Sequence, residues 1–525
     1  MAMGFNNQNN CSTRSMVFKK DFTNGIVFGR TGSGKTSCAI LPNIEDRIKS
    51  GYGVLIYDFK GNLHLQTKYL ANKYNKLSDV IEIGKPWGKR INLCDYLSLK
   101  QIPMIVKSYN DKSDYWDMAG RNLLENVFII KKSIYTLNKE LKNIDEDYIP
   151  LYEEKEVSYS SVYSCVSTVN NINEFYNIAD MYLSSVSKSI HIIENILIKR
   201  KRKNIIYSLL NTIAKSLKTL KLYEKVKEED DHGKNAVVNH LNSLLSQIAI
   251  KDYLNVSDID VIKELRAGKI VIMDVSSLNE NILDAINMAI YTRLQKAVYN
   301  QMAPVSIVID EAQKVLSSEY LPQTDVCRES KFEYILATQD QVLLINKLGH
   351  NKFEELYTNL VDRYSFSSNS TDQLENFEYV NLDNHRKYFA EPLFIDKKEL
   401  IKVEHKFLKM FNFLEMIDYQ SSKKFMIHYD DKLLEDYKVM IETIDEKFIE
   451  VDYLSLETSL NDDYLNNIKE QSNLEALFED RDRFKEIEDK VQKCMNGMIN
   501  VFTRQKRLDE RFSELESAAC EKKFS

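Results

Sequence analysis

Short apolar runs alternate with helical stretches in two separate parts of the chain. Each run is brief, apolar and rich in β-branched residues, which is typical of a buried strand. The predicted strands cover residues 25–28, 54–58, 80–83, 268–275, 305–311, 334–339 and 360–366. Because strands that alternate with helices usually form a parallel sheet, the sequence predicts an α/β fold with a parallel central sheet.

The stretch between the two parts has a different pattern. Glycine and proline are almost absent from about residue 97 to 258, and apolar residues recur at helical spacing. The sequence therefore predicts an all-α domain over 98–258. This domain would interrupt a nucleotide-binding domain formed by 19–97 and 259–401.

Both ends of the chain are polar. Residues 1–18 start with an Asn-rich stretch and are predicted to form a flexible tail, not a signal peptide. Residues 402–525 are predicted to form an acidic helical C-terminal extension. Within it, residues 441–480 contain twelve acidic and two basic side chains.

The overall composition narrows the class of protein. The 525 residues carry a net charge of −7, so any contact with nucleic acid must come from local basic patches. The seven cysteines are scattered and form no C-x-x-C pair, which argues against a disulfide framework or a zinc site. No apolar run reaches the roughly 18 residues of a membrane span. We expect a cytoplasmic protein, which could also be peripheral to the inner face of a membrane through partner proteins.

A phosphate-binding loop is the strongest motif in the sequence. Residues 29–36 read Gly-Arg-Thr-Gly-Ser-Gly-Lys-Thr and fit G-x-x-x-x-G-K-[ST] at every fixed position, directly after the predicted strand 25–28. Lys35 would reach the β- and γ-phosphates of ATP or GTP, and Thr36 would hold Mg²⁺. The predicted nucleotide-binding residues are Gly29, Arg30, Thr31, Gly32, Ser33, Gly34, Lys35, Thr36 and Ser37.

Hydrolysis also requires a carboxylate for the metal and a group that activates water. Asp310 and Glu311 end a predicted strand, where ligands bind in parallel sheets, so Asp310 would support Mg²⁺ and Glu311 would be the general base. Gln339 ends the next strand and could sense the γ-phosphate. Arg328 is either a surface arginine or an arginine finger that acts on a neighbouring subunit. The other interpretation of the carboxylates and Gln339 is that they are solvated strand ends.

These motifs together resemble the type IV secretion coupling proteins, the conjugative DNA-transfer ATPases of the FtsK/HerA-like superfamily. The resemblance covers about residues 17–400 and depends on the order of the motifs. Besides the phosphate loop, Asp310-Glu311 and the pair of Arg328 and Gln339, the matching segments are Leu41-Pro42-Asn43, Asp58-Phe59-Lys60-Gly61-Asn62, Ile91-Asn92-Leu93, Asp114-Tyr115-Trp116, Asn122-Leu123-Leu124, Pro392-Leu393 and Glu399-Leu400.

The resemblance implies a RecA-like P-loop ATPase that uses ATP and Mg²⁺ in a homo-hexameric ring around DNA. It also favours Arg328 as the finger in trans. The sequence departs from the family in two ways. It has no N-terminal membrane helices, and Phe59 and Asn62 replace the usual Pro and Glu of the D-P-K-G-E signature.

Two charged segments are candidate contacts with partners. The five cations of 199–203 could bind DNA phosphates without sequence preference, or could be a solvated helix face. The acidic C-terminal segment could bind a relaxase, an adaptor or a channel protein, could limit nonspecific DNA binding, or could be a solvated appendage.

Three functions are compatible with this pattern. The first is an ATP-driven motor that recruits and translocates DNA or a nucleoprotein to a conjugation or secretion channel. The second is a soluble FtsK/HerA-like DNA translocase in packaging, genome maintenance or anti-phage defence. The third is a nucleotide-gated adaptor that binds protein substrates without pumping DNA.

Overall fold

The computed structural model describes residues 16–410, with gaps at 86, 108–113, 144–148, 151–156, 194–199, 222–231, 296–301, 319, 323 and 368–376. Most of the predicted N-terminal tail and nearly all of the acidic C-terminal extension therefore lie outside the described residues. Lys199, in the basic run, also lies outside them. The described chain divides into two compact units, one containing 16–101 with 251–410 and the other 102–250.

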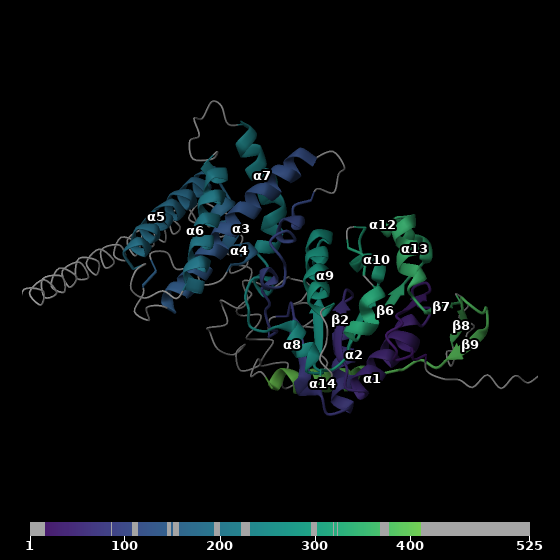
Figure 1. The fold of residues 1–525 in the computed structure, drawn as a ribbon. Coiled ribbons are helices and arrows are strands. Elements are labelled where there is room, and N and C mark those ends of the chain that lie inside the picture. The colour runs from purple at the N-terminus through teal and green to yellow at the C-terminus, as the bar shows by residue number, and fades with distance from the viewer. Residues whose placement is uncertain are drawn as a thin grey trace, which may run out of the picture. The chain divides into compact units, whose positions relative to one another are not determined.

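The second unit is helical throughout its described residues (Figure 1). A 3₁₀ turn at Ile102–Ile105 leads into the unit. Its helices are α3 (Asp114–Lys142), α4 (Tyr159–Val166), α5 (Val169–Ile193), α6 (Arg200–Leu220) and α7 (His232–Ala249). Helix α3 packs against both α6 and α7, because its apolar residues fall on one face and are buried there.

The first unit is built on a nine-stranded sheet in the order β3-β4-β2-β5-β6-β1-β7-β8-β9. The pairings from β3 to β7 are parallel, and those of β7 with β8 and β8 with β9 are antiparallel. The strands are β1 (Gly25–Phe28), β2 (Gly53–Asp58), β3 (Val80–Ile83), β4 (Ile270–Asp274), β5 (Val305–Asp310), β6 (Phe332–Thr338), β7 (Asp362–Phe366), β8 (Phe377–Asn381) and β9 (Lys387–Ala390). All seven predicted strands are present, and the predicted α/β fold is confirmed. Strands β8 and β9 are not predicted by the sequence pattern.

Helices cover both faces of this sheet. On one face the helices are α1 (Leu41–Lys49), α2 (Leu63–Lys73) and α14 (Lys397–Lys409), which lie together at the bottom of Figure 1. The other helices of the unit are α8 (Val261–Arg266), α9 (Glu280–Leu294), α10 (Ala312–Val315), α11 (Cys327–Ser330), α12 (Gln341–Leu348) and α13 (His350–Thr358). Since both faces are covered, the central strands are buried along their whole length, which explains why apolar residues predominate in them.

Helix α14 crosses the boundary that the sequence predicts at residue 401. It packs on α2, and Phe407 is buried in the core of the first unit. Glu404 of α14 and Glu82 of β3 both pair with the fully buried Lys68 of α2. This buried charge cluster ties α14 to the sheet-containing unit. Among the described residues, no helix is both long and apolar enough to cross a membrane.

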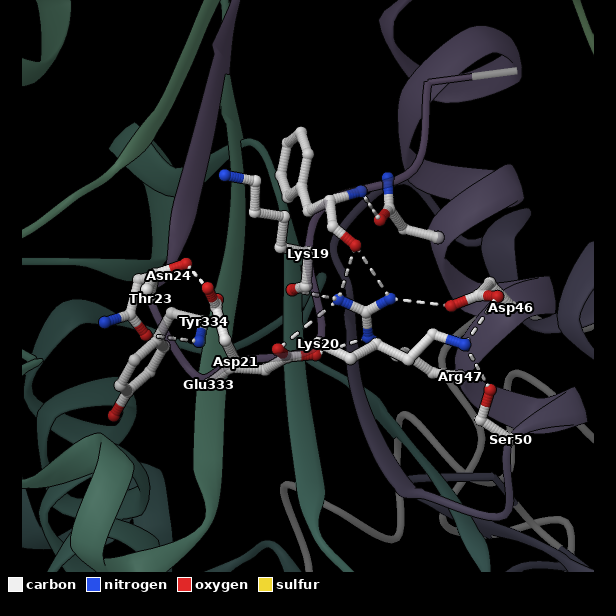
Figure 2. Close-up of polar contacts among 12 residues, drawn as sticks. Lys19, Lys20, Asp21, Thr23, Asn24, Asp46, Arg47, Ser50, Glu333 and Tyr334 are labelled. Carbon is white, nitrogen blue, oxygen red and sulfur yellow. Dashed lines mark hydrogen bonds and ion pairs between the residues drawn. The ribbon is translucent and has the colours of Figure 1, made fainter. Parts of the chain in front are cut away.

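A second buried charge, Arg47 of α1, joins three segments (Figure 2). Its Nε donates to Glu333 of β6 at 2.5 Å, and its Nη1 donates to Asp46 at 2.7 Å. Its Nη2 donates to the backbone carbonyls of Phe18 at 3.2 Å and Lys19 at 3.1 Å. These hydrogen bonds connect α1, the helix that follows the phosphate loop, to strand β6 and to the segment before β1.

Candidate functional site

The phosphate loop joins β1 to a helix that starts at Lys35. The first six helical residues, Lys35–Ile40, form a π-type turn, and α1 continues from Leu41. Gly32 and Gly34 have φ values of 80° and 89°, in the left-handed region that favours glycine. A Cβ on Gly34 would also lie only 2.7 Å from the ring of Phe377. The loop conformation therefore requires glycine at this position.

Lys35 is folded back into its own loop. Its Nζ donates to the carbonyl oxygen of Gly29, and to that of Arg30 at 3.0 Å. Burial lowers the pKa of Lys35, and the nearby carboxylates of Asp310 and Glu311 partly oppose this shift. The loop therefore holds a buried ammonium at the position from which the lysine of this motif binds phosphate.

Thr36 and Asp310 meet although 274 residues separate them in the sequence. The Thr36 hydroxyl donates to Oδ2 of Asp310 at 2.8 Å. Strand β6 lies between β1 and β5, so the contact crosses the carboxyl end of β6. These are the two residues that the sequence predicts as Mg²⁺ ligands.

Asp310 has the features of a metal ligand. Its Oδ1 is buried and has no hydrogen-bond partner among the described residues. Burial raises the pKa of Asp310, because its surroundings disfavour the ionised form. A divalent cation would satisfy the unpaired oxygen and stabilise the carboxylate, so the residues present fit Mg²⁺.

Glu311 follows directly and has a left-handed backbone, with φ of 80°. Its Oε2 accepts from Nε2 of Gln339 at 3.1 Å and from Nε2 of Gln313. Its Oε1 forms an ion pair with Lys60. Burial alone would raise the pKa of Glu311, but Lys60 and the two amides outweigh burial and hold the pKa below its usual value.

The remaining predicted residues fall into two groups. Ser37 donates weakly to the carbonyl of Gly34, at 3.3 Å, and the hydroxyl of Ser33 is buried without a partner among the described residues. Arg328 lies elsewhere, exposed on α11, before the first residue of β6. Because the seven residues of β6 span roughly 20 Å, Arg328 does not reach the phosphate loop of its own chain.

Lys60 was not predicted as a site residue. It follows β2, which pairs in parallel with β5, so both strands end at the same edge of the sheet. The Asp58 carboxylate accepts the backbone N–H of Gly61 at 2.9 Å and that of His64 at 3.0 Å. These bonds fold the loop that carries Lys60 toward Glu311. The sequence signal for this residue is Asp58 at the end of a strand, with Lys60-Gly61 beginning two residues later.

Comparisons with known proteins give similar solved structures of low sequence identity. No protein-family model and no curated protein matches the chain. The plasmid coupling protein TrwB in complex with ADP and Mg²⁺ has a TM-score of 0.41 at 13% identity, covering 72% of this chain and 86% of that one. The unbound bacterial conjugative coupling protein TrwB has a TM-score of 0.40 at 12% identity, covering 72% and 80%. VirB4 of Thermoanaerobacter pseudethanolicus has a TM-score of 0.35 at 12% identity, covering 72% and 91%. Because all three scores are low, the functional conclusions below rest on this chain's own residues.

Proposed function

We propose that this chain is a Mg²⁺-dependent ATPase. The observation that carries the proposal is the 2.8 Å contact between Thr36 and Asp310 beside Glu311. The proposal is supported by a phosphate loop, a candidate base and a buried carboxylate whose Oδ1 has no partner among the described residues, which lie together at the carboxyl ends of the parallel strands. Ligands bind at this edge in folds of this class.

Each residue of this site would have a separate role in the reaction. Lys35 and the loop N–H groups would bind the phosphates, and Thr36 and Asp310 would hold Mg²⁺, which neutralises charge on the transferring phosphoryl group. Glu311 would accept a proton from the attacking water. Gln339, which already contacts Glu311 at 3.1 Å, would orient that water through its amide.

We further propose that the ATPase is a motor of the coupling-protein type, which recruits and translocates DNA or a nucleoprotein. The order of motifs supports this proposal, together with the helical unit inserted between β3 and β4. In that unit, α6 carries the exposed Lys215 and Lys218. The soluble translocase is the second candidate, since the same site would drive it. The protein-substrate adaptor remains the alternative in which DNA has no effect.

DNA-stimulated hydrolysis tests the motor proposal. We expect duplex or single-stranded DNA to raise the rate of ATP hydrolysis by the full chain. This stimulation should fall steeply with salt, because the contacts are to phosphates. Replacing Lys215 and Lys218 together by Glu should weaken stimulation without changing the DNA-free rate. Hydrolysis that no DNA stimulates, combined with tight binding of a protein substrate, would favour the adaptor.

Arg328 is proposed to act on the site of a neighbouring copy in a homo-hexamer. Arg328→Ala should then reduce hydrolysis about a thousandfold or more while nucleotide binding persists. The matched control is Arg386→Ala, an exposed arginine in the turn between β8 and β9, which should have no effect. The rate per chain should also fall on dilution as the assembly dissociates. A monomer that hydrolyses ATP at the full rate would contradict the assignment.

A further inference from the structure

Lys60 and Glu311 form an ion pair of unequal burial. The side chain of Lys60 is 41% exposed, whereas that of Glu311 is 3% exposed. The amides of Gln313 and Gln339 donate to Oε2 of Glu311, and the ammonium of Lys60 lies beside Oε1. A base in this arrangement has little freedom to approach a water molecule beside a phosphate. Hydrolysis that uses this base would require Lys60 to move.

The loop that carries Lys60 is anchored on both sides of its tip. Asp58 accepts two backbone N–H groups, from Gly61 and His64, which fixes the base of the loop. At the tip, Gly61 has a φ of 74°, and a Cβ added there would meet no atom within 4 Å. Lys60 is therefore held near the site, while its long side chain is 41% exposed and can redirect its ammonium.

The charges around Lys60 indicate where the ammonium would go. The site contains two lysines, Lys35 and Lys60, and two carboxylates, Asp310 and Glu311. The two carboxylates raise the pKa of Lys60 even though burial opposes this, so Lys60 stays charged. The terminal phosphate of ATP carries more negative charge than a single carboxylate and would compete with Glu311 for this cation. ADP lacks that phosphate.

We infer that Lys60 is a positioning residue that restrains Glu311 through their ion pair and moves to the terminal phosphate when ATP binds. The move frees one oxygen of Glu311 to accept the proton of the attacking water. Lys60 thereby makes the base available only when a terminal phosphate is present. This inference rests on the proposed ATPase function.

The test is the affinity of the full chain for a non-hydrolysable ATP analogue and for ADP, both with Mg²⁺. Lys60→Met should bind the analogue roughly tenfold more weakly, because a charge-assisted contact to phosphate is lost, and should bind ADP as the wild type does. Lys60→Arg should restore most of the difference. The matched control is Lys73→Met, since Lys73 is also an exposed lysine paired with one carboxylate, Glu45.

A double-mutant cycle with Glu311→Gln distinguishes restraint of Glu311 by Lys60 from a purely structural ion pair between the two residues. Glu311→Gln removes the charge that competes for Lys60, so it should tighten binding of the ATP analogue. The same substitution should have no such effect in the Lys60→Met background. A purely structural ion pair would change ATP and ADP affinities equally and would give no coupling specific to ATP.

The outcomes distinguish this inference from the proposed function. If the wild type hydrolyses ATP and Lys60→Met keeps the wild-type ratio of ATP-analogue to ADP affinity, the inference is overturned and the ATPase stands. If the wild type binds neither nucleotide, both are overturned. Loss of analogue affinity alone, rescued by Lys60→Arg, supports the inference.

Discussion

Glu311→Gln should reduce ATP hydrolysis by roughly a hundred- to ten-thousandfold without weakening nucleotide binding. The amide matches the carboxylate in size and can keep a hydrogen bond with Gln339, but it cannot accept a proton from water. Because the side chain ends in a shape similar to the native one, the left-handed backbone at this position should be unaffected. Phosphate release measures the loss, and equilibrium binding of an ATP analogue measures what remains.

The control for this variant is Glu45→Gln. Glu45 of α1 also pairs with one lysine, Lys73 of α2, and its side chain is 18% exposed. The Glu45→Gln variant should hydrolyse ATP at the wild-type rate. If Glu311→Gln kept that rate as well, Glu311 would not be the base, and the assignment of the site would have to change.

Arg47→Met should lower the free energy of unfolding by about 3–5 kcal/mol, because it leaves a buried carboxylate without its partner. The arginine side chain is fully buried, and Glu333 is 3% exposed. Burial raises the pKa of Glu333 even with Arg47 present, so loss of Arg47 should raise this pKa further. A raised pKa in the folded state means that the destabilisation is largest at neutral pH and shrinks as the carboxyl is protonated at lower pH.

Denaturant unfolding at two pH values measures this effect. Adding Glu333→Leu to Arg47→Met should recover much of the loss, since an apolar pair replaces the unpaired charge. Lys20→Met is the control, because Lys20 pairs with Asp46 while 39% exposed and should contribute at most about 1 kcal/mol. Equal losses for Arg47→Met and Lys20→Met would contradict the account of this buried network.

The central strands and the phosphate loop were predictable because their signals are local. Residues 305–309 form an apolar run, interrupted only by Ser306, and the strand ends at Asp310, which is typical of a strand buried on both faces. Strands β8 and β9 lack this signal. They form an antiparallel hairpin at the sheet edge, and most of their side chains are partly exposed, including the ion pair of Lys387 and Glu378. Their mixed polarity therefore resembles that of a loop.

Contacts between distant segments account for the other differences. Lys60 contacts Glu311 only because β2 and β5 are neighbours in the sheet, and the strand order cannot be read from either segment alone. The boundary at residue 401 follows a change in composition. Helix α14 continues past it because Glu404 pairs with Lys68 inside the first unit. The pairing of Arg47 with Glu333 spans 286 residues and likewise left no local pattern.

The most direct test of the central claim is phosphate release from ATP by the wild-type chain, with and without Mg²⁺. The geometry of Thr36, Asp310 and Glu311 predicts hydrolysis that needs Mg²⁺ and is lost in Glu311→Gln. No release with Mg²⁺, at protein concentrations high enough for assembly and in the presence of DNA, would contradict the claim. Equal release by the wild type and Glu311→Gln would contradict it as well.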